Sequence, residues 1–162
     1  MTKTKIVALN ELAKRVKELR AGGKKVVATN GCFDLLHLGH VRYLETARAL
    51  GDILVVGLNS DQSVRELKGP DRPVNNENDR AEIIAALESV DLVAIFPELR
   101  ATRFIELAMP DVYVKGGDYN SETLNSEERA ALQKIGSKID LVPFEKGYST
   151  SGLLEKLRGG GK

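Results

Sequence analysis

The sequence predicts an α/β protein: a Rossmann-like, doubly wound, parallel five-stranded sheet with helices on both faces. Short apolar segments, mostly β-branched, recur along the chain, and segments with helical spacing alternate with them. Strands that are apolar on both faces are typical of buried parallel sheets. Strict alternation of strand and helix requires right-handed crossovers, which place helices on both sides of the sheet. The expected strands are residues 24–29, 53–58, 92–96, 111–115 and 139–142.

The intervening segments carry helix signals. Val41, Leu44 and Ala47 share one helical face before Gly51, and residues 83–87 and 104–108 repeat the pattern. Asn125 is expected to cap a helix that runs to Gly136, because Glu127 and Glu128 follow in the first turn. An N-terminal helix is predicted at about 8–21, and a last helix after a hydroxyl-rich cap at 149–151. Residues 68–76, rich in Gly and Pro, are expected to form a functional loop.

Length and composition indicate one domain over residues 1–162, with a core at about 24–157 and frayed tails at 1–5 and 159–161. The 24 basic and 23 acidic side chains are interleaved, so neither nucleic acid nor an anionic membrane is expected as a partner. The chain lacks an apolar run of transmembrane length, which predicts a cytoplasmic protein. The single cysteine, Cys32, excludes an internal disulfide and is interpreted as a small buried hydrophobe.

Residues 29–40 carry the strongest signal for chemistry. The first strand is expected to end at Thr29, and a helix to begin close to His40. The N-terminus of a helix offers free backbone N–H groups and a positive dipole end, which together favour phosphate. Both histidines of the chain, His37 and His40, fall here, and imidazoles can donate hydrogen bonds to phosphate oxygens on which charge accumulates. The segment therefore predicts phosphate chemistry.

The stretch Gly31-Cys-Phe-Asp-Leu-Leu-His-Leu-Gly-His40 resembles the signature of the cytidylyltransferase-like HxGH nucleotidyltransferases. Further stretches resemble one branch, the D-glycero-β-D-manno-heptose 1-phosphate adenylyltransferases: 59–61, 67–69, 72–75, 90–91, 110–111 and 114–119. The likeness covers about residues 25–157. In this branch the transferase is often fused to a heptose kinase, and a chain of 162 residues resembles the free-standing form.

The resemblance implies a sugar 1-phosphate adenylyltransferase that moves AMP from ATP to the heptose 1-phosphate. The products would be ADP-heptose and pyrophosphate, for lipopolysaccharide or surface-glycan synthesis. It also implies Mg²⁺ as cofactor, a separate heptose kinase upstream and a homo-oligomer. Positioning and charge stabilisation are expected to dominate catalysis of this kind.

Site residues follow from position and resemblance together. The expected catalytic residues are His37, His40 and Lys68. Nucleotide binding is expected from Thr29, Asn30, Gly31, Phe33, Asp34, Gly39, Lys115, Gly117, Asp118, Ser149, Thr150 and Ser151. Arg72 and Arg80 are expected to bind the sugar phosphate, although Arg80 equally fits a helix residue paired with an acid. Asp34 is the candidate metal ligand, with capping of its own loop as the alternative.

One position departs from the broader family. An arginine commonly precedes the Gly-Ile-Ser-Thr motif, whereas Phe144 stands at that place here, within Phe144-Glu-Lys-Gly-Tyr-Ser-Thr-Ser151. The heptose branch shares the departure. Lys146 is the candidate substitute for the missing arginine.

Other classes remain as alternatives. A dinucleotide oxidoreductase shares the fold class, with Asp61 as its ribose acid, but the first turn lacks G-x-G-x-x-G. A P-loop ATPase is disfavoured because G-x-x-x-x-G-K-[ST] does not occur. A non-catalytic nucleotide-binding domain would show binding without turnover. Within the family, the runner-up is a glycerol 3-phosphate or other cytidylyltransferase.

Overall fold

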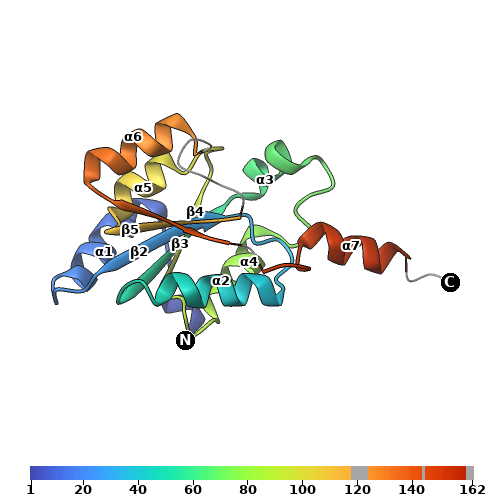
Figure 1. The fold of residues 1–162 in the computed structure, drawn as a ribbon, viewed down its shortest axis with the longest axis horizontal. Coiled ribbons are helices and arrows are strands. Elements are labelled where there is room, and N and C mark those ends of the chain that lie inside the picture. The colour runs from blue at the N-terminus through green and yellow to red at the C-terminus, as the bar shows by residue number, and fades with distance from the viewer. Residues whose placement is uncertain (118–123, 144, 160–162) are drawn as a thin grey trace.

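The computed structural model describes residues 1–117, 124–143 and 145–159. In this part of the chain, six strands form one sheet in the order β1-β4-β3-β2-β5-β6, and every neighbouring pair is parallel (Figure 1). The Rossmann-like α/β class predicted from the sequence is confirmed. The strands are β1 (Ile6–Val7), β2 (Val26–Gly31), β3 (Ile53–Asn59), β4 (Leu92–Phe96), β5 (Val112–Gly116) and β6 (Lys138–Val142).

Helices cover both faces of the sheet, as Figure 1 shows. The described helices are α1 (Leu12–Arg20), α2 (Leu38–Arg48), α3 (Asp61–Lys68), α4 (Glu77–Ala85), α5 (Thr102–Ala108), α6 (Ser126–Ile135) and α7 (Thr150–Gly159). Two short 3₁₀ turns, Thr2–Thr4 and Leu9–Glu11, precede α1. The predicted cap at Asn125 is confirmed, because its side chain accepts hydrogen bonds from the backbone N–H groups of Glu127 and Glu128.

Side chains of successive strand residues point to opposite faces of the sheet and pack into two separate hydrophobic cores. Val26 and Ala28 pack with α1, α5 and α6, whereas Val27 between them packs with α2 and α4. The same alternation recurs in β3, whose seven residues are all buried. Both faces of the central strands are thus apolar, which is why the strands read as continuous hydrophobic runs.

Three features differ from the sequence expectation. The sheet has a sixth strand, β1, which pairs with β4 through Ile6 and Val7. The N-terminus is therefore not a frayed tail: its first turn is a 3₁₀ helix, and Lys5 Nζ donates to the Leu87 carbonyl at 3.1 Å. Helix α3 was also not predicted, and it places Lys68 at a helix end rather than in the following loop. Of the second expected tail, Gly159 belongs to the last helix of the chain, and residues 160–161 lie outside the described residues.

The topology fixes where a ligand binds. From β2 the chain winds outward through β3 and β4 and then crosses back to β5 on the other side of β2. The loops that follow β2 and β5 therefore diverge, and a crevice opens at the carboxyl ends of these strands. None of the described helices is long and apolar enough to span a membrane.

Candidate active site

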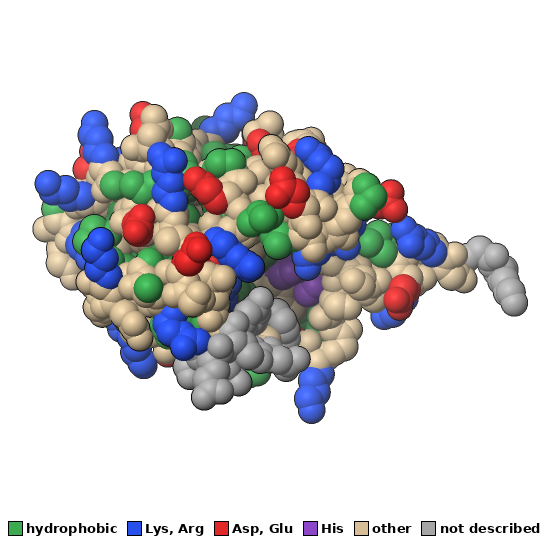
Figure 2. Space-filling view, turned by 90° about the horizontal axis from the view of Figure 1, so that it is seen from above, with side chains coloured by type: hydrophobic (Ala, Val, Ile, Leu, Met, Phe, Trp, Pro, Cys, Tyr) green, Lys and Arg blue, Asp and Glu red, His purple; other side chains and the backbone are tan. Residues whose placement is uncertain are grey.

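The crevice holds a cavity of about 720 Å³ at the carboxyl edge of the sheet. Its walls come from the loop after β2, the first half of α2, the end of α3, the loop after β4, the end of β5, and the starts of α6 and α7. Figure 2 shows the histidines at the bottom of a hollow, with Lys and Arg side chains beside them. Residues far apart in the sequence thus meet at the predicted edge.

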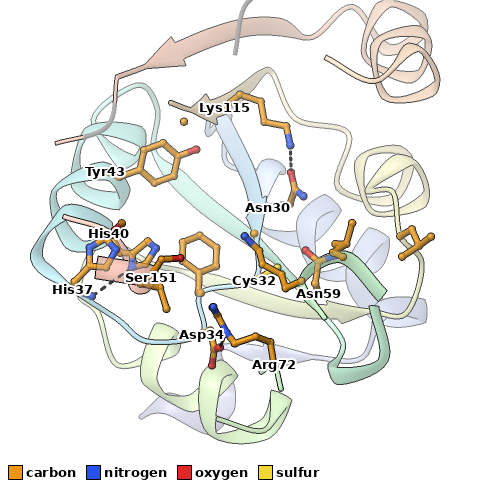
Figure 3. A pocket seen from close by; sticks show the side chains of 18 of the residues that line it. Asn30, Cys32, Asp34, His37, His40, Tyr43, Asn59, Arg72, Lys115 and Ser151 are labelled. Atoms are coloured by element: carbon orange, nitrogen blue, oxygen red, sulfur yellow. Dashed lines mark hydrogen bonds and ion pairs between the residues drawn. The ribbon is translucent and has the colours of Figure 1, made fainter. Parts of the chain in front are cut away.

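The histidine pair lies at the entrance to α2. His37 is the residue before the helix, and its imidazole stacks on that of His40, with ring centroids 3.8 Å apart (Figure 3). The backbone N–H of His37 donates to His40 Nδ1 at 3.4 Å. Because Nδ1 accepts, the proton of the neutral His40 ring resides on Nε2, which is then free to donate to a ligand.

Both imidazoles are held neutral in the free protein. Burial, with smaller contributions from His37 and Lys68, lowers the pKa of His40 to about 4. Burial also lowers the pKa of His37. A polyanion bound at the helix N-terminus favours the protonated forms, so nucleotide binding is expected to draw protons onto the pair.

This shift predicts a pH-dependent stability. Between pH 4 and 6.5 the unfolded chain binds a proton at residue 40 that the folded chain does not, so the free energy of unfolding rises with pH in this window. One proton gives a slope of at most about 1.4 kcal/mol per pH unit. Urea unfolding at several pH values is expected to show a shallower slope for His40→Gln than for the wild type. Equal slopes would contradict the assigned pKa.

Close packing explains two glycines of the motif. A Cβ built on Gly31 would stand 2.9 Å from the ring of Phe33, and one on Gly39 would stand 3.0 Å from His37 Nδ1 and from Tyr148 Cβ. Phe33 has a positive φ of 44°, a conformation that a bulky side chain rarely adopts, and its ring meets His40 edge-on at 5.4 Å. The backbone is thus wrapped around the imidazoles.

The wall opposite the histidines carries positive charge. Lys68, the last residue of α3, and Arg72 both line the cavity. Arg72 Nε donates to Asp34 Oδ2 at 2.5 Å, and the backbone N–H groups of Val74 and Asn75 also donate to this carboxylate. Although burial raises it, these hydrogen bonds lower the pKa of Asp34 overall. Asp34 therefore ties residues 72–75 to the motif loop.

Both oxygens of Asp34 accept protein hydrogen bonds, as its alternative role as a cap requires, although the donors belong to residues 72–75 rather than to its own loop. A role as metal ligand stays a prediction. The other buried carboxylate at the cavity, Glu128, accepts from the backbone N–H of Ala101 and lies near Lys115. No three His, Cys, Asp or Glu side chains come together among the described residues.

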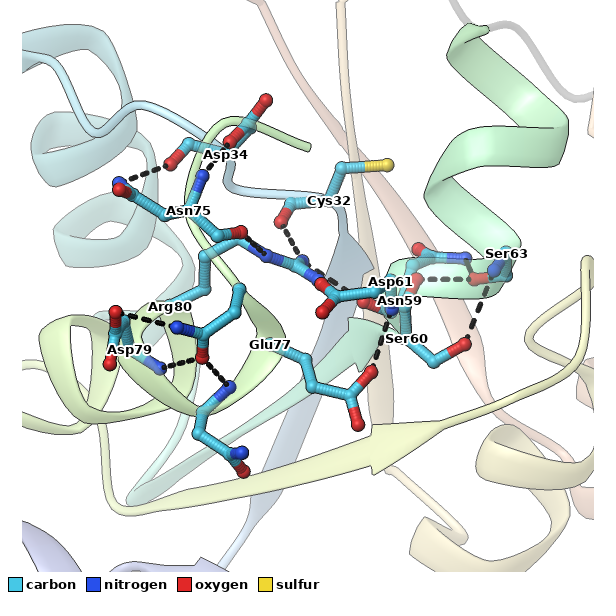
Figure 4. Close-up of polar contacts among 12 residues, drawn as sticks. Cys32, Asp34, Asn59, Ser60, Asp61, Ser63, Asn75, Glu77, Asp79 and Arg80 are labelled. Atoms are coloured by element: carbon cyan, nitrogen blue, oxygen red, sulfur yellow. Dashed lines mark hydrogen bonds and ion pairs between the residues drawn. The ribbon is translucent and has the colours of Figure 1, made fainter. Parts of the chain in front are cut away.

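Arg80 is placed differently from the predicted sugar phosphate contact. Its side chain is fully buried and does not line the cavity. The guanidinium donates to the carbonyls of Cys32, Asn59 and Asn75 at 2.6, 2.9 and 3.0 Å, and to Asp61 Oδ1 at 2.8 Å (Figure 4). It thus joins the loop after β2, the end of β3, the start of α3 and the loop before α4. Arg80 therefore holds together, from inside the protein, the segments that form this side of the cavity.

The start of α7 closes the cavity next to His37. Ser149, Thr150 and Ser151 all line it, and Ser149 Oγ accepts from the Gly152 N–H, which confirms the predicted cap. Thr150 Oγ1 donates to the Leu35 carbonyl at 3.3 Å and fastens the helix to the motif loop. Lys146 is exposed and does not line the cavity, and Phe144 lies outside the described residues.

The β5 side of the cavity is polar. Lys115 and Asn30 line it, with Lys115 Nζ donating to Asn30 Oδ1 at 3.0 Å. Gly117 follows with a positive φ of 86° and donates its N–H to the Val142 carbonyl. Asp118 lies outside the described residues. Thr29 is fully buried, and its hydroxyl meets the Tyr43 hydroxyl at 2.7 Å rather than facing the cavity.

Sequence reasoning missed several residues that line the cavity: Tyr43, Asn59, Leu99, Arg100, Glu128 and Tyr148. Asn59, at the end of β3, could have been found, because ligands gather at the carboxyl ends of strands. Tyr148, whose ring stacks on His37 at a centroid distance of 6.2 Å, adjoins a predicted site. Glu128 lies inside a helix, and no local pattern marks it. Cys32 is only partly buried and also lines the cavity, where burial raises the pKa of its thiol.

Comparison with known proteins gives close relatives. The chain is 52% identical over 156 residues to the "Bifunctional protein HldE" of Geotalea uraniireducens, and 53% identical over 148 residues to that of a Bradyrhizobium species. These alignments cover 96% and 91% of this chain. The chain spans only 31% and 30% of the length of these two relatives.

Solved structures agree in fold. A lipopolysaccharide core biosynthesis protein from Thermoplasma volcanium matches with a TM-score of 0.63 and 32% identity, covering 78% of this chain and all of the other. A pantoate-β-alanine ligase from Francisella tularensis shares the fold at a TM-score of 0.58 and 15% identity, over 91% of this chain and 69% of the other. The model of the cytidylyltransferase-like family matches residues 28–155, which include the histidine motif and the whole cavity wall from β2 to α7. This chain therefore belongs to the cytidylyltransferase-like family.

Proposed function

We propose that the protein transfers AMP from ATP to D-glycero-β-D-manno-heptose 1-phosphate and releases pyrophosphate. The observation that carries the proposal is the stacked, neutral histidine pair at the N-terminus of α2, facing a cavity with cationic and hydroxyl-bearing walls. The HldE relatives and the lipopolysaccharide core biosynthesis protein support a sugar-phosphate acceptor. The product would be ADP-heptose, for lipopolysaccharide or surface-glycan synthesis.

The reaction forms one bond and breaks one. An oxygen of the sugar phosphate attacks the α-phosphorus of ATP, and the bond from this phosphorus to the bridging oxygen of the β-phosphate breaks. Pyrophosphate leaves with the electron pair. His40 Nε2 donates a hydrogen bond to the phosphate oxygens on which charge grows, and the N-terminus of α2 adds its dipole. His37 packs against His40 and contacts the same phosphates.

The remaining walls position the substrates. Lys68 and Arg72 supply positive charge on one side, and the N–H groups and hydroxyls at the start of α7 supply donors on the other. A reaction of this kind gains most from holding the two phosphates in line. Arg72 is already fixed by Asp34, so its guanidinium is held in place before substrate arrives.

The proposal includes partners. The acceptor is made by phosphorylation of a sugar at its anomeric oxygen, so we propose a heptose kinase as the preceding activity. Magnesium would enter with the triphosphate, which supplies most of its ligands in many such sites. Homo-oligomerisation stays a prediction.

A pyrophosphate-release assay tests the substrates. ATP, CTP and GTP are each combined with heptose 1-phosphate, glycerol 3-phosphate and other phosphate acceptors. The proposal predicts that kcat/KM is highest for ATP with the heptose 1-phosphate. A preference for CTP would contradict it and favour a cytidylyltransferase. Binding without turnover for every pair would indicate a non-catalytic nucleotide-binding domain.

A further inference from the structure

A polar cluster lies at the β5 side of the cavity, away from the histidines. It consists of Asn30 from the end of β2, Lys115 from β5 and Glu128 from α6. Figure 3 shows Asn30 and Lys115 next to each other, with His37 and His40 on the other side of the view. The three side chains come from segments up to 98 positions apart in the sequence, at residues 30 and 128.

The charged side chains of the cluster are largely buried, and hydrogen bonds hold the cluster in place. The side chains of Lys115 and Glu128 are 12% and 7% exposed, and Lys115 Nζ lies 3.9 Å from Glu128 Oε2. Asn30 Oδ1 accepts from the Tyr113 hydroxyl and from Lys115 Nζ. Glu128 Oε1 accepts from the Ala101 N–H at 2.8 Å. These contacts fix the orientation of each group before a ligand binds.

Because the side chains of Asn30 and Glu128 are held in place, each presents one particular group to a ligand. Because Asn30 Oδ1 is engaged, the amide NH₂ of Asn30 is left to donate, and it makes no hydrogen bond among the described residues. Glu128 Oε2, whose lysine contact is longer than a hydrogen bond, is left to accept. The same wall of the cavity therefore carries a donor, the Asn30 amide, and an acceptor, Glu128 Oε2.

This arrangement selects the ligand chemistry. An ionised phosphate has only acceptors and offers no donor to the Glu128 carboxylate, and an apolar group would leave buried polar atoms unpaired. A hydroxyl both donates and accepts, and two adjacent hydroxyls can meet the carboxylate and the amide together. We infer that Asn30, Lys115 and Glu128 form a subsite that recognises the vicinal hydroxyls of a sugar.

The inference rests on the proposed function, since such hydroxyls occur on the ribose of ATP and on the sugar 1-phosphate. The test therefore has two arms, each measured as equilibrium binding by calorimetry with the full chain. The first arm titrates ATP, 2′-deoxy-ATP and 3′-deoxy-ATP without acceptor. The second titrates heptose 1-phosphate and analogues that lack one hydroxyl. Each arm compares the wild type with Glu128→Gln.

The subsite predicts coupling between side chain and hydroxyl. Glu128→Gln keeps an oxygen that can accept from the Ala101 N–H, so the fold is retained, yet affinity for the ligand that carries the diol is expected to fall about tenfold. Removing the contacted hydroxyl should cost about tenfold in the wild type and little in the variant. Coupling in the first arm identifies ribose as the source, and coupling in the second identifies the acceptor sugar.

Glu127→Gln is the matched control. It makes the same chemical change at the neighbouring position of α6, where the side chain is exposed, and is expected to leave both arms unchanged. Additive effects of Glu128→Gln and hydroxyl removal in both arms would overturn the subsite. Failure of the proposed function reads differently: the wild type would then release no pyrophosphate with any acceptor, while the titrations still report on the cluster.

Discussion

His40→Ala is expected to lower kcat by about a hundredfold to a thousandfold, the usual cost of removing one donor to a charge that develops in the transition state. The Nε2 proton of His40 is the donor at issue, since Nδ1 accepts from the His37 backbone. Its interaction strengthens as charge moves onto the leaving pyrophosphate. The KM for ATP should therefore change much less than kcat.

The measurement is steady-state pyrophosphate release, with ATP affinity from calorimetry and folding from thermal unfolding. His40→Asn serves as the companion variant, because an amide can still donate and is expected to retain part of the rate. Unchanged kcat in His40→Ala would remove the pair from the chemistry. A loss of ATP affinity that accounts for the whole defect would make His40 a binding residue only.

Arg80→Met is expected to lower the free energy of unfolding by about 3–5 kcal/mol, the typical cost of removing one partner of a buried ion pair. The substitution leaves Asp61 without its cation and the carbonyls of Cys32, Asn59 and Asn75 without their donor. Arg80→Lys keeps the charge, but an ammonium cannot reproduce the planar fork that reaches four acceptors. Its loss should be intermediate.

Urea unfolding followed by circular dichroism measures the effect. Arg103→Met is the matched control: it is the same substitution at a 62% exposed side chain, whose ion pair with Glu98 spans 3.7 Å. The control should change stability by less than about 0.5 kcal/mol. Equal losses in the two variants would show that the Arg80 contacts contribute nothing beyond those of a surface arginine.

The fold was predictable where apolar patterns are long. The five strands expected from the sequence all occur. Four of them, β2 to β5, are runs of mostly buried residues, whereas in β6 only Val142 is buried. Strand β1 was not predicted, because it consists of only two residues, Ile6 and Val7, and is stabilised by pairing with β4. Helix α3 was not predicted, because Val64 is its one fully buried apolar residue and one residue gives no periodic pattern. Ser60 and Asp61 nevertheless carry the signal of a helix start.

The site was predictable as far as local pattern reaches. His37 and His40 lie in one short segment that contains the end of a strand, a turn and the start of a helix. The role of both residues could therefore be predicted from the local sequence. For Asp34 and Arg80 the sequence left two roles open, because their partners lie elsewhere in the chain: Arg72 lies 38 positions from Asp34, and Cys32 lies 48 positions from Arg80. The sequence alone does not show whether tertiary contacts will bury a given charged side chain.

If this cavity transfers a nucleotidyl group to a sugar phosphate, the two ends of ATP must part. They can be followed with ATP labelled at the α- or the γ-phosphate in the presence of heptose 1-phosphate. The α-label is expected to enter the sugar nucleotide, and the γ-label is expected to leave in pyrophosphate. Transfer of the γ-label to the sugar, or retention of the α-label in ATP while heptose 1-phosphate is bound, would contradict this transfer.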